Sequence, residues 1–314
     1  MRFRHGVLTV TLAIATALPL AGTAVADGSH GPGLLTATDY STGTANMVAL
    51  NPVAGTVTTV YAQGATDGVV SPDGSQVAYI HPESTCIPQP EGGCAYAQDL
   101  MVAGADGSNP HVLVAGVQPE TNDAPYVAHP HWSPDGQRIV FDSPRGLEWV
   151  NTDGTGEQTL AVGMRGTFSP DGRSLAFLQT TEYQAADGSW QYGTDVSIMD
   201  TTTLETRRLT TSHDVWASPA DWSPDGTRLA YTTQYGVHSV DVATGAVTDL
   251  NSGWTTPLSS DQNAVYSPDG TKIAFEGHDD VTGDNATYVM NATDGSGLQR
   301  LTDRPVLLTD WRTE

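Results

Sequence analysis

Two histidines separated by a single proline are the strongest candidates for chemistry in this chain of 314 residues. His129 and His131 belong to the segment HPHW, directly before a tetrapeptide SPDG. Imidazole nitrogens are common ligands of divalent transition metals, and such an ion can acidify the proton beside a sugar carboxylate. One hypothesis is therefore a metal-assisted polysaccharide lyase or hydrolase centred on these two histidines.

A structural role is the alternative that the spacing favours. Histidines often end strands and bond to neighbouring elements, and no third histidine stands at a spacing typical of a zinc site. The chain also has no GxSxG segment, and DDVTGD at 279–284 lacks the closing glutamate of an EF-hand loop. We therefore expect no catalytic residue and no obligate cofactor, with a divalent metal at His129 and His131 as the open alternative.

The elements that position these histidines come from a repeat. SPDG starts at Ser71, Ser133, Ser169, Ser223 and Ser267. An apolar, usually aromatic residue precedes each copy, and an apolar-small-aromatic triplet such as Ile139-Val140-Phe141 follows it. Proline pre-sets one turn position, aspartate bonds back to nearby amides and glycine takes the left-handed conformation. The repeat predicts a strand, a tight turn and a strand, and needs no catalytic explanation.

Two independent counts, of outer hairpins and of SPDG copies, each predict six four-stranded units. Six further pairs of apolar segments, each joined by a Gly-bearing or polar turn, are the outer hairpins. Trp311 stands 45 residues after Tyr266, in the aromatic position of a sixth, truncated copy. Its missing strands are expected at the other end of the chain, at 34–38 and 46–61. The fold class is therefore all-β: a six-bladed β-propeller of four-stranded antiparallel blades, whose ring closes between the two ends of the chain.

The segments DWSPDGTRLAY and VYSPDGTKIAF resemble the WD-like propeller repeats of the TolB family, and the resemblance covers residues 34–314. The periplasmic protein of that family carries an α/β domain before its propeller, which residues 27–33 are too few to hold. Only the propeller half of the resemblance therefore applies. Similar repeats occur beside peptidase domains and in polysaccharide lyases, among which oligogalacturonate lyases use a histidine-rich central site. The resemblance implies a fold and leaves the function open.

Propeller geometry predicts that one face gathers the long connections, at 81–97, 115–130, 179–195, 211–220, 251–264 and 276–287. Aligned on the aromatic position, His131 matches Asp221 and Asp310, so these three side chains, with His129 nearby, are expected to converge at the channel mouth. Aromatic side chains on the same connections could stack on sugars or grip a peptide, or could pack back on the blades. They are Tyr126, Tyr183, Trp190, Tyr192, Trp216 and Trp254.

The start of the chain has the three parts of a secretory signal peptide. Arg2, Arg4 and His5 are followed by an apolar run and by the small residues Ala24-Val25-Ala26. We expect cleavage near Ala26 and release of the mature protein outside the cytoplasm, without a lipid anchor. In such a protein Cys86 and Cys94, eight residues apart, are expected to form a local disulfide.

The net charge of the chain restricts the classes of molecule that it can bind. Thirteen Lys and Arg stand against 36 Asp and Glu, a formal net charge of −23. A surface this negative repels phosphate backbones and anionic lipids, so nucleic acid and membrane are not expected partners. We expect a monomeric, secreted recognition module that binds a protein, peptide or glycan through the long connections, with a scaffold lacking any small-molecule site as a further alternative.

Overall fold

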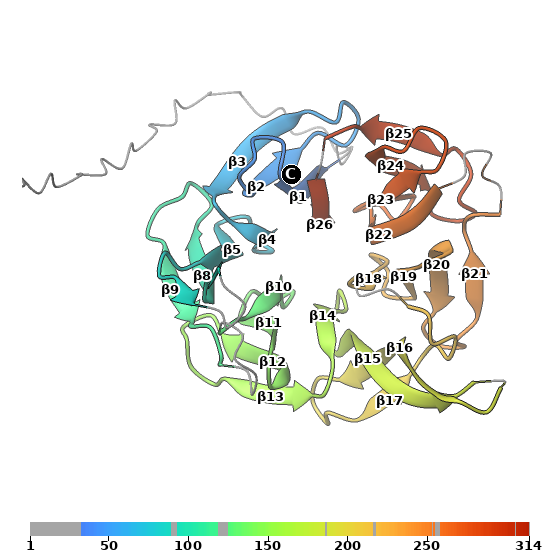
Figure 1. The fold of residues 1–314 in the computed structure, drawn as a ribbon, viewed down its shortest axis with the longest axis horizontal. Helices are drawn as coiled ribbons and strands as arrows, with labels where there is room; N and C mark the ends of the chain where they lie inside the picture. Colours follow the sequence, from blue (N-terminus) through green and yellow to red (C-terminus); the bar gives the residue numbers. More distant parts are fainter. Residues whose placement is uncertain are drawn as a thin grey trace, which may run out of the picture.

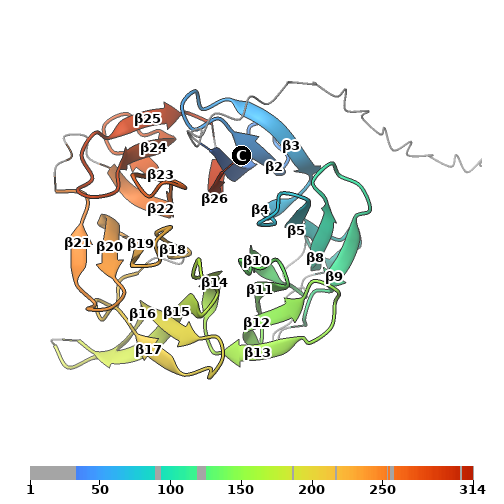
Figure 2. The same ribbon diagram turned by 180° about the vertical axis from the view of Figure 1, so that it is seen from behind.

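A computed structural model describes residues 33–88, 93–118, 125–185, 187–215, 218–252, 254, 258–304 and 306–313. These residues form six four-stranded antiparallel sheets arranged as blades around a central channel, which confirms the predicted propeller (Figures 1 and 2). No helix occurs in the described ranges, and hence none that could cross a membrane. The expected signal peptide, residues 1–26, lies outside them.

Every blade uses one strand order from the channel outward, and the bounds are as follows. The first contains β26 (Val306–Arg312), β1 (Leu34–Asp39), β2 (Asn46–Leu50) and β3 (Val57–Gln63). The second contains β4 (Thr66–Val70), β5 (Gln76–Pro82), β8 (Gln98–Gly104) and β9 (His111–Val114). The third contains β10 (Ala128–Trp132), β11 (Arg138–Ser143), β12 (Gly146–Asn151) and β13 (Gln158–Ala161).

The remaining three blades follow the same plan. The fourth contains β14 (Met164–Phe168), β15 (Ser174–Gln184), β16 (Trp190–Asp200) and β17 (Thr206–Arg208). The fifth contains β18 (Asp221–Trp222), β19 (Arg228–Thr233), β20 (Gly236–Asp241) and β21 (Val247–Asp249). The sixth contains β22 (Leu258–Tyr266), β23 (Lys272–Asp279), β24 (Asn285–Asn291) and β25 (Gln299–Thr302). The short strands β6 (Ile87–Pro88) and β7 (Cys94–Ala95) form a separate hairpin.

The ring closes where the two ends of the chain share the first blade. β26 is its innermost strand and pairs antiparallel with β1, with Leu35 opposite Trp311. Trp311 is 7% exposed and packs with Leu35, Val48 and Leu50 in one apolar cluster. The expected aromatic position of the sixth copy is therefore occupied as predicted.

Hydrogen bonds explain why SPDG recurs. In all five copies the serine hydroxyl donates to the aspartate two residues later, at 2.6–2.7 Å, and accepts the N–H of the residue five positions on, at 2.9 Å. The five glycines have φ between 67° and 74°, which favours glycine over other residues. The turn interpretation is confirmed.

The core lies between neighbouring blades. The aromatic residues of the SPDG triplets Phe141, Phe177 and Phe275 are wholly buried. Ile80 of β5 belongs to the same apolar cluster as Trp132 of the next blade. Full burial of each such side chain stabilises the folded state by roughly 1.5–3 kcal/mol. The repeated apolar residues therefore hold blade against blade, so that the inner strands can surround the channel.

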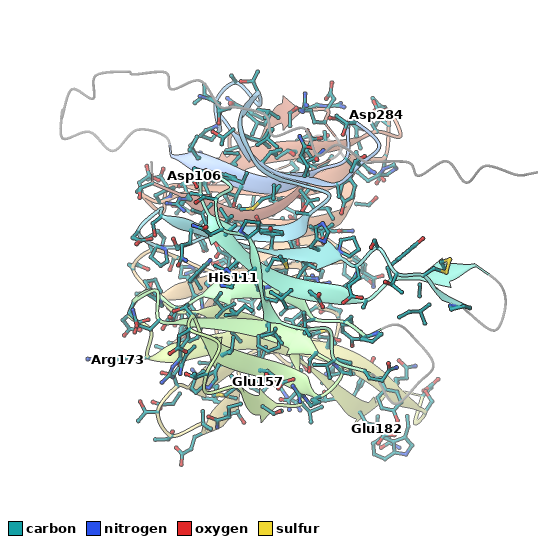
Figure 3. All side chains as sticks on the ribbon, turned by 90° about the vertical axis from the view of Figure 1, so that its left-hand side faces the viewer. Asp106, His111, Glu157, Arg173, Glu182 and Asp284 are labelled. Atoms are coloured by element: carbon teal, nitrogen blue, oxygen red, sulfur yellow. A yellow bond between two sulfur atoms is a disulfide. The ribbon has the colours of Figure 1, made fainter. Side chains whose placement is uncertain are left out.

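Figure 3 shows two different faces in side view. The turns that carry Asp106 and Arg173 lie on one side, with the SPDG and outer-hairpin turns, and we call it the SPDG face. The disulfide hairpin and the segments that carry Glu182 and Asp284 lie on the opposite side, the long-loop face. Cys86 and Cys94 form the predicted disulfide. A disulfide persists in oxidising compartments, which is consistent with a secreted or periplasmic protein.

The prediction of irregular long loops was wrong for three of the six connections. β15 and β16 pair continuously as far as Gln184 and Trp190, β23 and β24 as far as His278 and Asn285, and β22 begins at Leu258. Segments 179–184 and 190–195 are rich in threonine and aromatic residues, which pack well across paired strands. These connections are therefore strand extensions that project from the long-loop face.

The SPDG network predicts a pH-dependent cost for one hydroxyl. Ser133→Ala removes a donor to Asp135 and leaves the Arg138 N–H without its acceptor, so we expect a loss of about 1–2 kcal/mol at pH 7. The Ser133 hydroxyl, first among several causes, lowers the pKa of Asp135, so this stability is present above the unfolded-state pKa and lost as the pH falls through the folded one.

Urea unfolding at neutral and acidic pH measures this effect. The difference between wild type and Ser133→Ala should shrink as the pH falls below about 4. Ser252→Ala changes an exposed serine for which no side-chain hydrogen bond is found among the described residues, and should leave the unfolding free energy unchanged. An equal cost for both variants would contradict the assigned network.

Candidate functional site

The inner strands carry a β-bulge at the long-loop end of the channel. At the bulge, the inner strands β4, β10, β14 and β22 each contain one residue more than the facing stretch of the second strand that pairs with them. This extra residue lies three positions before the apolar or aromatic residue that precedes SPDG. The residues at this position have left-handed φ values of 48–59° although none is glycine. They are Asp67, His129, Arg165 and Asn263. A bulge re-aims the side chain of its extra residue, and such sites often have functional roles.

Side chains of the preceding blade hold two of these bulges. The N–H of Arg165 donates to Asp142 Oδ1 at 2.7 Å, and the N–H of Asp67 donates to Thr38 Oγ1 at 3.1 Å. The N–H of Leu308, in the irregular strand β26, donates to Glu276 in the same way. The second strand of one blade therefore fixes the backbone of the next at the channel mouth.

A cavity of about 170 Å³, the channel cavity, opens between the inner strands at this end. The four bulge residues line it together with His131 and Asp221. The remaining walls are mostly apolar or carry hydroxyl or amide groups. They are formed by Val69, Pro130, Gly166, Thr167, Ser218, Pro219, Gln262, Ala264, Val265, Leu307, Leu308 and Thr309.

His129 is held between two carboxylates. Its Nδ1 lies 2.9 Å from Asp142 Oδ2, and its Nε2 lies 3.5 Å from Asp67 Oδ2. A carboxylate oxygen accepts hydrogen bonds, so the shorter contact engages Nδ1 as a donor, while Nε2 lies at ion-pair distance from Asp67. A metal ligand needs a nitrogen lone pair instead. The geometry of His129 therefore favours a bridge between blades two and three over metal ligation.

His131 and Asp221 connect blades through backbone N–H groups. His131 Nδ1 accepts the N–H of Phe168 at 3.4 Å, and Asp221 Oδ2 accepts the N–H of Tyr266 at 2.7 Å. In each pair the donor is the aromatic residue of the next blade. Both predicted site residues thus line the channel cavity and satisfy the free edge of a neighbouring inner strand.

Burial keeps both of these side chains uncharged near neutral pH. It lowers the pKa of His131 to about 4, although a backbone hydrogen bond with Trp132 acts in the opposite direction. It raises the pKa of Asp221 to about 8, with a contribution from nearby Asp310 and against hydrogen bonds from the backbone of Tyr266 and Trp222. Burial also raises the pKa of Asp310, against the charge of Arg312. Asp310 influences Asp221 but does not line the cavity.

Arg165 is the cavity residue that the sequence prediction missed. It occupies the bulge position that Asp67 and His129 hold in the two preceding blades. Alignment three residues before the aromatic position gives Asp67, His129, Arg165, Pro219, Asn263 and Leu308, with one cation among the six. The sequence signal for Arg165 is therefore its place as the single arginine or lysine of this column, a signal that the column of His131 does not contain.

The predicted aromatic residues do not gather at the cavity. Trp254 stacks on Phe275, with ring centroids 5.2 Å apart, and its Nε1 donates to the carbonyl of Gly295 at 3.1 Å. Tyr126 forms an isolated β-bridge with Val117. Trp190 is 66% exposed on the projecting β15–β16 hairpin, next to Tyr192 at 75%. Trp216 lies outside the described residues.

A second imidazole and carboxylate meet at the base of that hairpin. His213 Nδ1 lies 2.7 Å from Asp195 Oδ2, and the His213 ring stacks on Tyr183 with centroids 4.1 Å apart. Asp195 is fully buried, and its Oδ1 accepts a hydrogen bond from the Thr210 hydroxyl. The pair ties blade four to the connection that follows it. Within the described ranges, no group of three or more His, Cys, Asp or Glu side chains is arranged to hold a metal ion.

Comparisons with known proteins agree on the fold alone. No protein-family model matches the sequence. No curated protein is significantly similar to it. Among solved structures, TolB from Acinetobacter baumannii has a TM-score of 0.52 at 21% identity, over 73% of this chain and 53% of that chain. The chain thus spans about half the length of that TolB.

Two further solved structures with a similar fold belong to proteins of different kinds. A chain of the nidogen–laminin complex has a TM-score of 0.56 at 10% identity, over 89% of this chain and 97% of that one. An oligogalacturonate lyase from Vibrio parahaemolyticus has a TM-score of 0.50 at 12% identity, over 82% and 90% respectively. These likenesses show the propeller, and the site must supply any argument about function.

The pKa of Asp221 predicts how stability depends on pH. The folded state holds the Asp221 proton more tightly than the unfolded chain, so the stability from this group is present at low pH and lost as the pH rises through about 8. Asp221→Asn keeps an acceptor for the Tyr266 N–H and cannot ionise. Between about pH 5 and about pH 9, the variant should therefore lose about 1–2 kcal/mol less unfolding free energy than the wild type loses.

Denaturant unfolding at several pH values provides the measurement. Glu205→Gln, an exposed carboxylate on the SPDG face, should follow the wild-type profile and serves as control. If Asp221→Asn and wild type lose stability in parallel between about pH 5 and about pH 9, the assignment of a protonated Asp221 in the channel is wrong.

Proposed function

We propose that this TolB-like β-propeller is a secreted recognition module, without catalysis of its own, that binds a protein, peptide or glycan through its long-loop face. One observation carries the proposal. The titratable side chains that sequence reasoning assigned to chemistry, His129, His131 and Asp221, each have a partner in the scaffold. The cavity between them is therefore lined by side chains that already serve the scaffold.

A neighbouring cavity extends the binding area along the same face. It is bordered by Tyr40, Glu276, His278 and Arg304, and it shares Gln262 and Leu307 with the channel cavity. A ligand longer than one residue or sugar could therefore run from the channel toward the seam between blades six and one. The exposed Trp190 and Tyr192, two residues apart on one strand face, offer a further aromatic contact surface.

Export and charge agree with this role. The disulfide fits an oxidising compartment, and the net charge of −23 disfavours nucleic acids and anionic membranes as partners. The nidogen–laminin complex shows that a chain of similar fold can take part in a protein complex. Binding on the varied face of a rigid propeller needs no further domain.

A cavity-filling substitution tests the proposal. Leu307 is half-buried and lines both cavities, so Leu307→Trp should fill the space that they share. We expect it to weaken binding at least tenfold, about 1.4 kcal/mol, for those members of a synthetic peptide library and an oligosaccharide array that bind the wild type. Leu113→Trp makes the same change at a half-buried position of the outer strand β9 and should keep wild-type affinity. Equal binding by both variants would contradict a site on this face.

The second candidate function is the metal-assisted lyase, for which the likeness to the Vibrio parahaemolyticus enzyme is the supporting observation. Elemental analysis of the purified mature protein separates the two functions. Because both ring nitrogens of His129 face carboxylates, we expect no stoichiometric transition metal and no cleavage of uronate polymers. The opposite result would be a stoichiometric metal in the wild type that is lost in the double variant His129→Ala, His131→Ala, together with cleavage of uronate polymers. That result would contradict the recognition function and support the lyase.

A further inference from the structure

Arg165 has no ion-pair or hydrogen-bond partner for its side chain among the described residues, in which almost all other cations are paired. Nine of the eleven cationic side chains of the described residues have a partner: Arg138 over the Trp149 ring, Arg145, Arg208, Arg300 and Arg304 on carboxylates, and Arg207, Arg228, Lys272 and Arg312 on carbonyl, hydroxyl or amide oxygens. Arg173 points into solvent from an SPDG turn (Figure 3). Arg165 alone is half-buried, lines a cavity and has no described carboxylate oxygen within 4.0 Å of its guanidinium.

The two nearest carboxylates are already engaged. Asp142 accepts the backbone N–H of Arg165 through one oxygen and contacts His129 through the other. Asp67 contacts the second nitrogen of His129. Burial lowers the pKa of Arg165, and the charges of Asp142 and Asp67 oppose that effect without forming an ion pair. The positive charge is therefore partly removed from water and has no direct counterion in the part of the chain that the structure describes.

The rest of the cavity suits an anion with an apolar neighbour. Across the channel, His131 and Asp221 are uncharged at neutral pH, so they do not repel a carboxylate there. Val69, Val265 and Leu307 supply apolar wall. The hydroxyls of a uronate sugar would need several hydrogen-bond partners, whereas the cavity hydroxyls of Thr167 and Thr309 already donate to the carbonyls of Ala220 and Gly68.

We propose that Arg165 binds the carboxylate of a ligand whose adjoining group is apolar, namely the free C-terminus of a peptide or protein that ends in an aliphatic residue. A guanidinium can hold a carboxylate through two parallel hydrogen bonds. The aliphatic side chain then lies against the apolar wall, and the preceding residues leave through the shared edge at Gln262 and Leu307. This inference rests on the proposed recognition function and names its ligand class.

The unpaired charge also has a cost for folding. A cation partly withdrawn from water and without a counterion destabilises the folded state. Arg165→Gln should therefore melt no lower than the wild type. A residue with a purely structural role would lower the melting temperature when replaced, so thermal unfolding distinguishes the two roles before any ligand is added.

Calorimetric titration with defined probes tests the inference. The probes are a hexapeptide ending in leucine with a free carboxylate, the same peptide amidated, octanoate and galacturonate. We expect the free-acid peptide to bind the wild type at least tenfold more tightly than its amide. Arg165→Gln should abolish that difference and leave the amide affinity unchanged, and Arg165→Lys should keep part of it. Arg173→Gln, the exposed control, should behave as wild type.

Each contrary outcome is distinguishable. Equal affinity for acid and amide in the wild type, or a lowered melting temperature of Arg165→Gln, overturns the inference. Octanoate or galacturonate binding as tightly as the free-acid peptide overturns the peptide as ligand. If other peptides or glycans bind in a way that Leu307→Trp blocks, without a carboxylate preference, recognition stands and only the role of Arg165 falls. If no probe or library member binds, both proposals fall.

Discussion

The free edges of the innermost strands are the constraint on which this structure depends. Each inner strand pairs with a second strand on one side only, so the backbone groups on its other edge must find partners around the channel. Neighbouring blades supply them. Trp132 and Trp222 donate from their indole nitrogens to the carbonyls of Val69 and Thr167, and His131 and Asp221 accept the N–H groups of Phe168 and Tyr266. The polar lining of the channel is thus first of all a set of bonds that hold the blades together.

This constraint changes how the candidate residues are understood. A histidine and two aspartates at equivalent positions look like a ligand set when only their types and spacing are known. In the structure, burial leaves His131 neutral and keeps Asp221 protonated, and both are acceptors for the next blade. His129 bridges two carboxylates, one of which also fixes the bulge that carries Arg165. Groups engaged in this way hold neighbouring blades together and shape the cavity between them.

Most of the fold could be predicted from the sequence because its determinants are local. Serine, aspartate and glycine of SPDG complete one turn within six residues, and Trp311 needs only its spacing from Tyr266 to be recognised. The sequence also brought His129, His131 and Asp221 together, and these three side chains line one cavity, while their role in binding stays a prediction. Arg165 was missed because its exposure to the cavity depends on a bulge, which arises from pairing between strands and from Asp142 of another blade. The packing of Trp254 on Phe275 depends in the same way on contacts distant in the sequence.

The bulge position also explains how a repeated fold can acquire an individual site. In the column of His131, the polar side chains of His131, Thr167 and Asp221 bond to the backbone of the next blade and are therefore committed to holding the ring together. Three residues earlier the backbone N–H is held by the preceding blade, as Asp142 holds Arg165 and Thr38 holds Asp67, so the side chain itself is free to differ. Aspartate, histidine, arginine and asparagine occupy this position in four blades. A recognition site built on this column can change its specificity blade by blade while the bonds that close the ring stay the same.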